Sequence, residues 1–133
     1  MATLLLIDDD QTIREMLDLL FSKSHECHTA DRAEQALAFL EFQSYDVVIT
    51  DISMPGLGGV EILRRIRQRH PKTPVIVITG REDEFKDIVL KMGAFAFFSK
   101  PFPLAGLEHA VINALEQQQE LQLHPESSLQ SVM

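Results

Sequence analysis

The sequence predicts a single-domain α/β fold, in which helices cover both faces of a five-stranded parallel sheet. Two observations lead to this prediction. Short apolar runs rich in β-branched residues alternate five times with segments whose apolar residues recur every three or four positions. The strongest of these runs are apolar throughout, as expected for strands that are buried on both faces. Right-handed crossovers leave few arrangements, and the flavodoxin-like, doubly wound order 2-1-3-4-5 is the simplest.

Composition and charge narrow the possible classes of function. A hydrophobic content of 45% and a charged content of 24% are ordinary for a soluble domain of 133 residues. The net charge of −8 disfavours nucleic acid or an anionic membrane as a direct partner, because both require a basic surface. The single cysteine, Cys27, cannot form an internal disulfide and is interpreted as a small buried hydrophobe. Without a membrane-length apolar run or a basic signal region, the protein is expected to be cytoplasmic.

The first half of the chain is predicted to supply two strands and two helices. Residues 3–7 form a continuous apolar run, which reads as a central strand that ends in three aspartates. A helix follows, with Asp10 as its expected N-cap. Its apolar face is formed by Ile13, Met16, Leu17, Leu20 and Phe21.

Residues 26–30 are predicted as a strand mainly because they lie between two helices. The pattern from Asp31 to Glu34 resembles a capping box and opens the second helix. That helix is expected to bury Ala33, Ala36, Leu37 and Leu40.

The third strand, residues 46–50, runs directly into Asp51. A loop rich in proline and glycine follows it. A third helix is expected from Gly58 or Gly59 to His70. Its inward residues are Leu63 and Ile66. Its four arginines are Arg64, Arg65, Arg67 and Arg69. They could form a phosphate-binding patch, but a solvated face that complements the helix dipole is the favoured interpretation.

The second half of the chain repeats the alternation. Residues 75–79 are predicted as the fourth strand, and a helix from about 82 to 92 ends at Gly93, which acts as a C-cap. This helix is expected to bury Phe85, Ile88, Val89 and Met92. Residues 95–99 form the fifth strand, and Pro103 is expected at the first position of the fifth helix. The fifth helix should bury Leu107, Val111 and either Ala114 or Leu115.

Residues 1–120 are predicted to form the domain. Beyond Glu116 the chain becomes rich in glutamine and then in serine. Residues 121–133 are therefore expected to be a flexible tail or the start of a linker to an output domain.

Acidic residues are expected to converge at the carboxyl edge of the sheet. In the predicted order, strands 1 and 3 are neighbours, so Asp8 and Asp9 should meet Asp51. Three carboxylates so close together repel one another, and a hard divalent cation removes that repulsion. An open site with few carboxylates and a carbonyl suits Mg²⁺ better than Ca²⁺. Asp8, Asp9, Asp51 and the backbone carbonyl of Ser53 are the expected ligands.

A cation and a hydroxyl should reach the same edge. Lys100 follows strand 5, and Thr79 ends strand 4. A carboxylate nucleophile beside a metal ion, an ammonium and a hydroxyl has what an aspartyl phosphate requires. Each residue alone is weak support, but all of them at the ends of the appropriate strands form a specific pattern.

On these motifs the chain resembles a receiver (CheY-like) domain of a two-component response regulator, over residues 3 to 117. The matching pieces are the acidic cluster after strand 1, the segment from Asp51 to Pro55 with Gly59, Thr79-Gly80, and Lys100-Pro101-Phe102. The resemblance implies that Asp51 accepts phosphate from the phosphohistidine of a sensor histidine kinase or a histidine phosphotransfer protein. It further implies that Asp8 and Asp9 hold Mg²⁺, and that Thr79 and Lys100 contact phosphoryl oxygens.

The resemblance also implies a switch with little enzymatic turnover, limited to self-catalysed phosphorylation and dephosphorylation. Phe97 matches the aromatic residue whose rotamer follows the threonine, and the surface of helix 4, strand 5 and helix 5 would engage an unknown output domain or effector. Ser53 and Arg81 occupy the positions that tune the phosphate lifetime, and a cis bond is expected before Pro101. Residues 94–96 lack the acids of family members that dimerise through ion pairs, so a homodimer of that kind is doubtful. Phe95 is either part of an apolar contact surface or simply buried, and a phosphorylation-dependent homodimer stays open.

Two alternatives were weighed. Asp8-Asp9-Asp10-Gln11-Thr12 fits the nucleophile motif of haloacid-dehalogenase-type phosphatases, with Asp8 as the nucleophile. That family needs a further acidic pair on a later strand, and the acids after Lys100 fall in a helix or the tail. The second alternative is a receiver fold that serves only as a docking module without phosphorylation. All the residues that the chemistry requires are present, which disfavours it.

Overall fold

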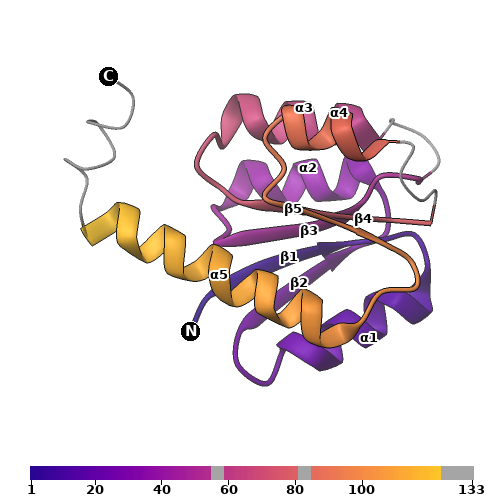
Figure 1. Ribbon diagram of the computed structural model, residues 1–133, viewed down its shortest axis with the longest axis horizontal. Coiled ribbons are helices and arrows are strands. Elements are labelled where there is room, and N and C mark those ends of the chain that lie inside the picture. Colours follow the sequence, from indigo (N-terminus) through magenta and orange to yellow (C-terminus); the bar gives the residue numbers. More distant parts are fainter. Residues whose placement is uncertain (55–58, 81–84, 124–133) are drawn as a thin grey trace.

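The computed structural model describes residues 1–54, 59–80 and 85–123 as a single three-layered unit. Five parallel strands form one sheet in the order β2-β1-β3-β4-β5, which confirms the predicted fold class and strand order. Helices α2, α3 and α4 cover one face of the sheet, and α1 and α5 cover the other (Figure 1). The elements in chain order are β1 (Thr3–Ile7), α1 (Gln11–Phe21), β2 (Glu26–Ala30), α2 (Ala33–Phe42), β3 (Val47–Asp51), α3 (Gly59–Arg69), β4 (Val75–Thr79), α4 (Lys86–Lys91), β5 (Ala96–Ser99) and α5 (Leu104–Leu123). None of the helices within these ranges is long and apolar enough to cross a membrane.

The strands bury side chains on both faces, so the core consists of two clusters separated by the sheet. Leu5 and Ile7 of β1 pack with α2 and α3, whereas Leu4 and Leu6 pack with α1 and α5. All four of these side chains have no exposed surface. Successive residues of a strand point to opposite faces, which explains why a continuous apolar run was needed here. Cys27 of β2 is half-buried against the α1 and α5 cluster, and burial raises the pKa of its thiol to about 11.

Two of the predicted helix starts can be compared directly. Asp10 is the N-cap of α1, as predicted, because its Oδ1 accepts a hydrogen bond from the Thr12 N–H at 2.9 Å. The capping box predicted at Asp31 and Glu34 is wrong. Arg32 is the N-cap of α2 and makes no capping bond with its side chain. Gln35 instead accepts from the Asp31 N–H at 3.0 Å, since its amide competes for the same donor one residue further along.

The later helices confirm most of the predicted inward residues. Leu107, Val111 and Ala114 of α5 are buried, as are Leu63 and Ile66 of α3. The burial predicted for Ile88 of α4 is wrong, because half of this residue is exposed (50%). The described helix is only six residues long and is buried through Val89, with Ile88 at the edge of its apolar stripe. The predicted start of this helix, at residue 82, lies outside the described residues.

Pro103 also differs from its predicted position. It precedes α5, which begins at Leu104, rather than occupying the first helical position. Its carbonyl accepts the Gly106 N–H at 3.1 Å, so it acts at the N-cap position. At the other end, α5 continues past residue 120 to Leu123.

Gly93 ends α4 as predicted, and its conformation restricts what can replace it. Its φ angle is +98°, and a Cβ atom there would lie 3.1 Å from Cδ of Arg67. We therefore expect Gly93→Ala to lower the free energy of unfolding by about 1 to 2 kcal/mol. Gly80→Ala is the matched control, because a Cβ at Gly80 meets no atom within 4 Å. Urea denaturation of both variants tests this, and equal stability of Gly93→Ala and the wild type would contradict it.

Candidate functional site

The carboxyl ends of four parallel strands bring the polar residues of the site together. In the register of β1 and β3, Ile7 pairs with Thr50, so the next residues, Asp8 and Asp51, lie at the same level. On the other side, Asp51 pairs with Ile78 of β4, which immediately precedes Thr79. Because the strands are parallel, all these side chains reach one edge of the sheet. The strand order thus builds the site from segments that are far apart in the chain.

Asp51 is almost fully buried, with 2% of its surface exposed. One carboxylate oxygen, Oδ1, accepts hydrogen bonds from both the N–H and the Oγ of Ser53, each at 2.8 Å. The other oxygen, Oδ2, accepts from Nζ of Lys100 at 3.0 Å. The Asp51 carboxylate therefore accepts from two neutral donors of Ser53 and from one cation, and these bonds fix its orientation.

Asp8 is completely buried, and its surroundings are less favourable. Its Oδ1 accepts from the Asp10 N–H at 2.9 Å, and its Oδ2 lies 2.9 Å from Nζ of Lys100. This second contact is an ion pair whose geometry is not that of a hydrogen bond, so Oδ2 has an unused acceptor position. Burial raises the pKa of Asp8, and the charge of Asp51 adds to this; the Asp10 N–H and Lys100 act in the opposite direction.

Lys100 is the cation that both buried carboxylates share. Burial alone would lower its pKa, but the close contacts with Asp8 and Asp51 and the negative charges of these residues together outweigh burial and raise it. The ammonium is therefore charged at neutral pH, and a single positive charge faces two carboxylates. The predicted cis peptide bond between Lys100 and Pro101 is confirmed.

The three acids fit a hard divalent cation. One carboxylate oxygen each from Asp8, Asp9 and Asp51 can be chosen so that all three lie within 4.8 Å of one another. Asp9 is exposed while the other two are buried, so the cluster is open to solvent on one side. The unused acceptor on Asp8 Oδ2 is an oxygen that a metal ion would satisfy. All-oxygen donors with an open, hydrated side suit Mg²⁺.

The remaining predicted residues lie around this cluster. Thr79 is fully buried, and its Oγ1 donates to Oγ of Ser53 at 3.5 Å. Phe97 of β5 is half-buried, pairs in register with Val77 and packs on the cluster beneath α2, α3 and α4. Arg81 lies outside the described residues, so its predicted role stays a prediction.

Arg14 was not found by sequence reasoning. Its Nη1 donates to the backbone carbonyl of Asp8 at 2.8 Å and so ties the first turn of α1 to the acidic loop. A cation four residues after the N-cap Asp10 was the available signal, because that spacing returns a helical side chain toward the start of the helix.

Comparison with known proteins agrees with this geometry. A family model described as "Response regulator receiver domain" matches residues 4–112, which is most of the chain. The chain belongs to this family. Receiver domains are regulatory phosphoacceptor domains in two-component phosphorelay signalling, so the phosphatase alternative is set aside. As a class, they use Mg²⁺ and interact with histidine kinases and output domains.

Individual relatives support the same assignment. The chain is 37% identical over 119 residues to the DNA-binding transcriptional regulator NtrC of Salmonella typhimurium, a match covering 85% of this chain and 25% of NtrC. The chain thus spans about a quarter of that relative. A receiver domain from Clostridium thermocellum is similar in structure, with a TM-score of 0.85, 35% identity, and coverage of 91% of this chain and 99% of that chain. TrrA from Thermotoga maritima, solved in complex with Mg²⁺ and BeF, gives a TM-score of 0.78 at 32% identity, covering 86% of this receiver and all (100%) of TrrA.

The shortage of positive charge around Asp8 can be tested by its effect on stability. We expect Asp8→Asn to raise the free energy of unfolding in EDTA at neutral pH by about 1 kcal/mol, because it removes one of several mutually repelling charges. The Asn side chain can still accept the Asp10 N–H. Since burial raises the pKa of Asp8, its ionised form costs stability above the unfolded-state pKa. The gain should therefore shrink as the pH falls and Asp8 takes up a proton.

Urea denaturation over a range of pH measures this effect. Asp9→Asn is the control, because Asp9 is exposed and its charge is screened by solvent. A less stable Asp8→Asn variant at neutral pH would show that the pair with Lys100 outweighs the repulsion.

Proposed function

We propose that this receiver accepts a phosphoryl group on Asp51 from a phosphohistidine of a sensor histidine kinase or a histidine phosphotransfer protein. The observation that carries the proposal is the contact of Asp51 with Nζ of Lys100 at 3.0 Å in a buried setting. A carboxylate oxygen of Asp51 attacks phosphorus, and the bond from phosphorus to the histidine nitrogen breaks with its electron pair going to the imidazole. Lys100 and the Thr79 hydroxyl would then each meet a phosphoryl oxygen.

Mg²⁺ would be held by Asp8, Asp9, Asp51 and the backbone carbonyl of Ser53. When bound, this ion supplies positive charge that neutralises the phosphoryl oxygens. The chain's own residues do the rest: Ser53 orients the Asp51 carboxylate through two 2.8 Å hydrogen bonds, and Lys100 stabilises its negative charge.

The output of phosphorylation would be a change of surface. Thr79 is drawn toward the phosphoryl group, Phe97 turns into the space beside it, and the surface of α4, β5 and α5 changes its affinity for a partner. That partner is an output domain or an effector protein, and a phosphorylation-dependent homodimer is a further option. Ser53 and Arg81 would set the lifetime of the phosphate. Residues 1–120 would form the receiver, which makes no direct contact with nucleic acid, and residues 121–133 a tail or linker.

Replacing Asp51 tests the acceptor directly. Incubation of the wild type with acetyl phosphate and Mg²⁺ should add the mass of one phosphoryl group, detected by intact mass spectrometry, and Asp51→Asn should abolish the addition. Glu116→Gln, which removes an exposed acid in the second half of α5, away from the carboxyl edge of the sheet, should be phosphorylated like the wild type. A phosphorylated Asp51→Asn protein would exclude Asp51 as the acceptor.

Two further readouts separate the alternatives. Beryllofluoride should shift the amide resonances of the wild type but not those of Asp51→Asn. If the wild type neither takes up phosphate nor responds to beryllofluoride, the docking-module alternative is correct. Steady hydrolysis of p-nitrophenyl phosphate by Asp51→Asn would instead revive the phosphatase alternative.

The acidic cluster should also make stability depend on metal. A ligand at about 100 times its dissociation constant stabilises a protein by roughly 2.7 kcal/mol, so millimolar Mg²⁺ should raise the melting temperature. Asp9→Asn should weaken this response, whereas Glu116→Gln, in the second half of α5, should not. An unchanged melting temperature of the wild type in Mg²⁺, measured by calorimetry, would argue against the metal site.

A further inference from the structure

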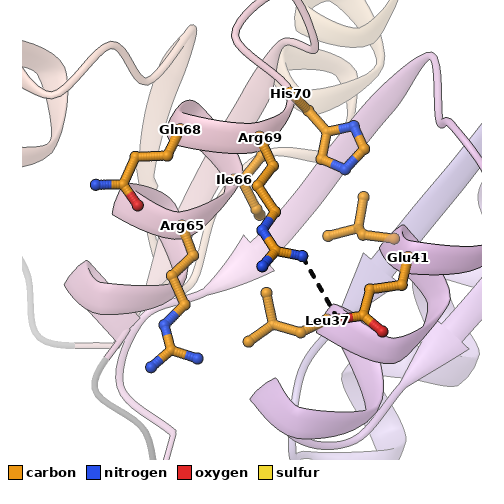
Figure 2. A pocket seen from close by; sticks show the side chains of 8 residues that line it. Leu37, Glu41, Arg65, Ile66, Gln68, Arg69 and His70 are labelled. Atoms are coloured by element: carbon orange, nitrogen blue, oxygen red, sulfur yellow. Dashed lines mark ion pairs between the residues drawn. The ribbon is translucent and has the colours of Figure 1, made fainter.

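A cavity lies away from the phosphorylation site, between the ends of α2 and α3. Its volume is about 490 Å³. Leu37 and Leu40 of α2 and Ile66 of α3 provide its apolar surface. Arg65 and Arg69 of α3 project beside it, and Arg69 reaches across to Glu41 of α2 (Figure 2). Gln68 and His70 complete the lining. We call this cavity the α2–α3 groove.

The rim of the groove has more positive charge than its own acids can neutralise. Glu61 is shared by two guanidinium groups, those of Arg64 and Arg65. The hydrogen bond from Arg64, and then that from Arg65, lowers the pKa of Glu61, so this single acid is ionised and fully engaged. The third guanidinium, Arg69, lies 3.5 Å from Glu41, and both of these side chains are largely exposed (72% and 66%). Among the charged residues that line the groove, the guanidinium groups of Arg65 and Arg69 face a single acid, Glu41, on the surface of a chain whose net charge is −8.

A groove with an apolar floor and a cationic rim favours a partner that offers an apolar side chain and negative charge. We propose that the α2–α3 groove binds an acidic peptide segment of another protein, with one bulky apolar side chain in the groove and carboxylates beside Arg65 and Arg69. The exposed pair between Arg69 and Glu41 is weak and exchanges readily for a partner carboxylate.

The position of the groove makes this binding independent of phosphorylation. Helix α2 ends at Phe42 before β3 begins, and α3 ends at Arg69 before β4 begins. The groove therefore lies at the edge where the strands start, whereas Asp51 lies where they end. It is also separate from the surface of α4, β5 and α5. An acidic partner could stay docked in both states of the receiver.

Three blocked hexapeptides serve as probes: EELFEE, KKLFKK and EESSEE. In amide NMR titrations, EELFEE should cause saturable shifts at Leu37, Glu41 and Arg69. KKLFKK should cause none, and EESSEE, without an apolar anchor, should bind about fivefold more weakly or worse. Addition of beryllofluoride and Mg²⁺ should change the affinity for EELFEE by less than about twofold, since the two sites are not in contact.

Charge variants distinguish peptide binding in the groove from a general effect of the protein's net charge. Arg65→Ala with Arg69→Ala should lower the affinity for EELFEE about tenfold, because each exposed pair contributes up to about 1 kcal/mol. Arg64→Ala is the control for either single variant, Arg65→Ala or Arg69→Ala: it removes one positive charge from the same helix but does not line the groove, and it should change affinity by less than about twofold. Arg65→Lys with Arg69→Lys should retain most of the binding.

Several outcomes would overturn the proposal. One is an absence of saturable shifts with EELFEE at millimolar concentration. Another is an equal loss of affinity in Arg64→Ala, which would reduce the effect to net charge. The same shifts on addition of inorganic phosphate alone, at equal affinity, would indicate a small oxyanion site. Concentration-dependent shifts of these amides without peptide would indicate that a second copy of the chain occupies the groove.

Discussion

The whole site depends on one ammonium group held between two buried carboxylates. Nζ of Lys100 lies 2.9 Å from Asp8 and 3.0 Å from Asp51, and these three groups lie at the carboxyl ends of three different strands, at one edge of the sheet. One positive charge cannot neutralise two carboxylates in a setting of low polarity, so the site retains excess negative charge. That excess gives the acidic cluster its affinity for a cation, and it lets incoming positive charge alter the arrangement of Lys100.

The core enforces the geometry that this ion-pair cluster requires. Alternate residues of β1 pack into opposite layers, so slipping the strand by one position would move every apolar side chain to the wrong face. The same slip would separate Asp8 from Asp51. The register that buries Leu5 and Ile7 is therefore the register that aligns the two acids. Stability and the position of the acceptor thus follow from a single packing constraint.

This coupling explains which features could be predicted from the sequence. Strand order and the acids at the strand ends could be predicted, because each follows from long apolar runs to which many side chains contribute. The cap of α2 could not be predicted, because Glu34 and Gln35 compete for the same N–H at nearly equal cost. The exposure of Ile88 depends on how far the apolar stripe of α4 is covered. The contact of Arg14 with the Asp8 carbonyl depends on one flexible side chain, which leaves no periodic pattern.

The arginines of α3 are another feature that the sequence predicted only in part, because side chains of one helix have different surroundings. A solvated face that complements the dipole was predicted, and Arg67 does donate to the carbonyls of His70 and Pro71 at the end of the helix. Burial lowers the pKa of Arg67, which packs beside Gly93 and is not available to a partner in the groove. Arg65 and Arg69 are four residues apart, so helical geometry puts them on one face. Unlike Arg67, both line the groove, and their charged groups lie on its rim.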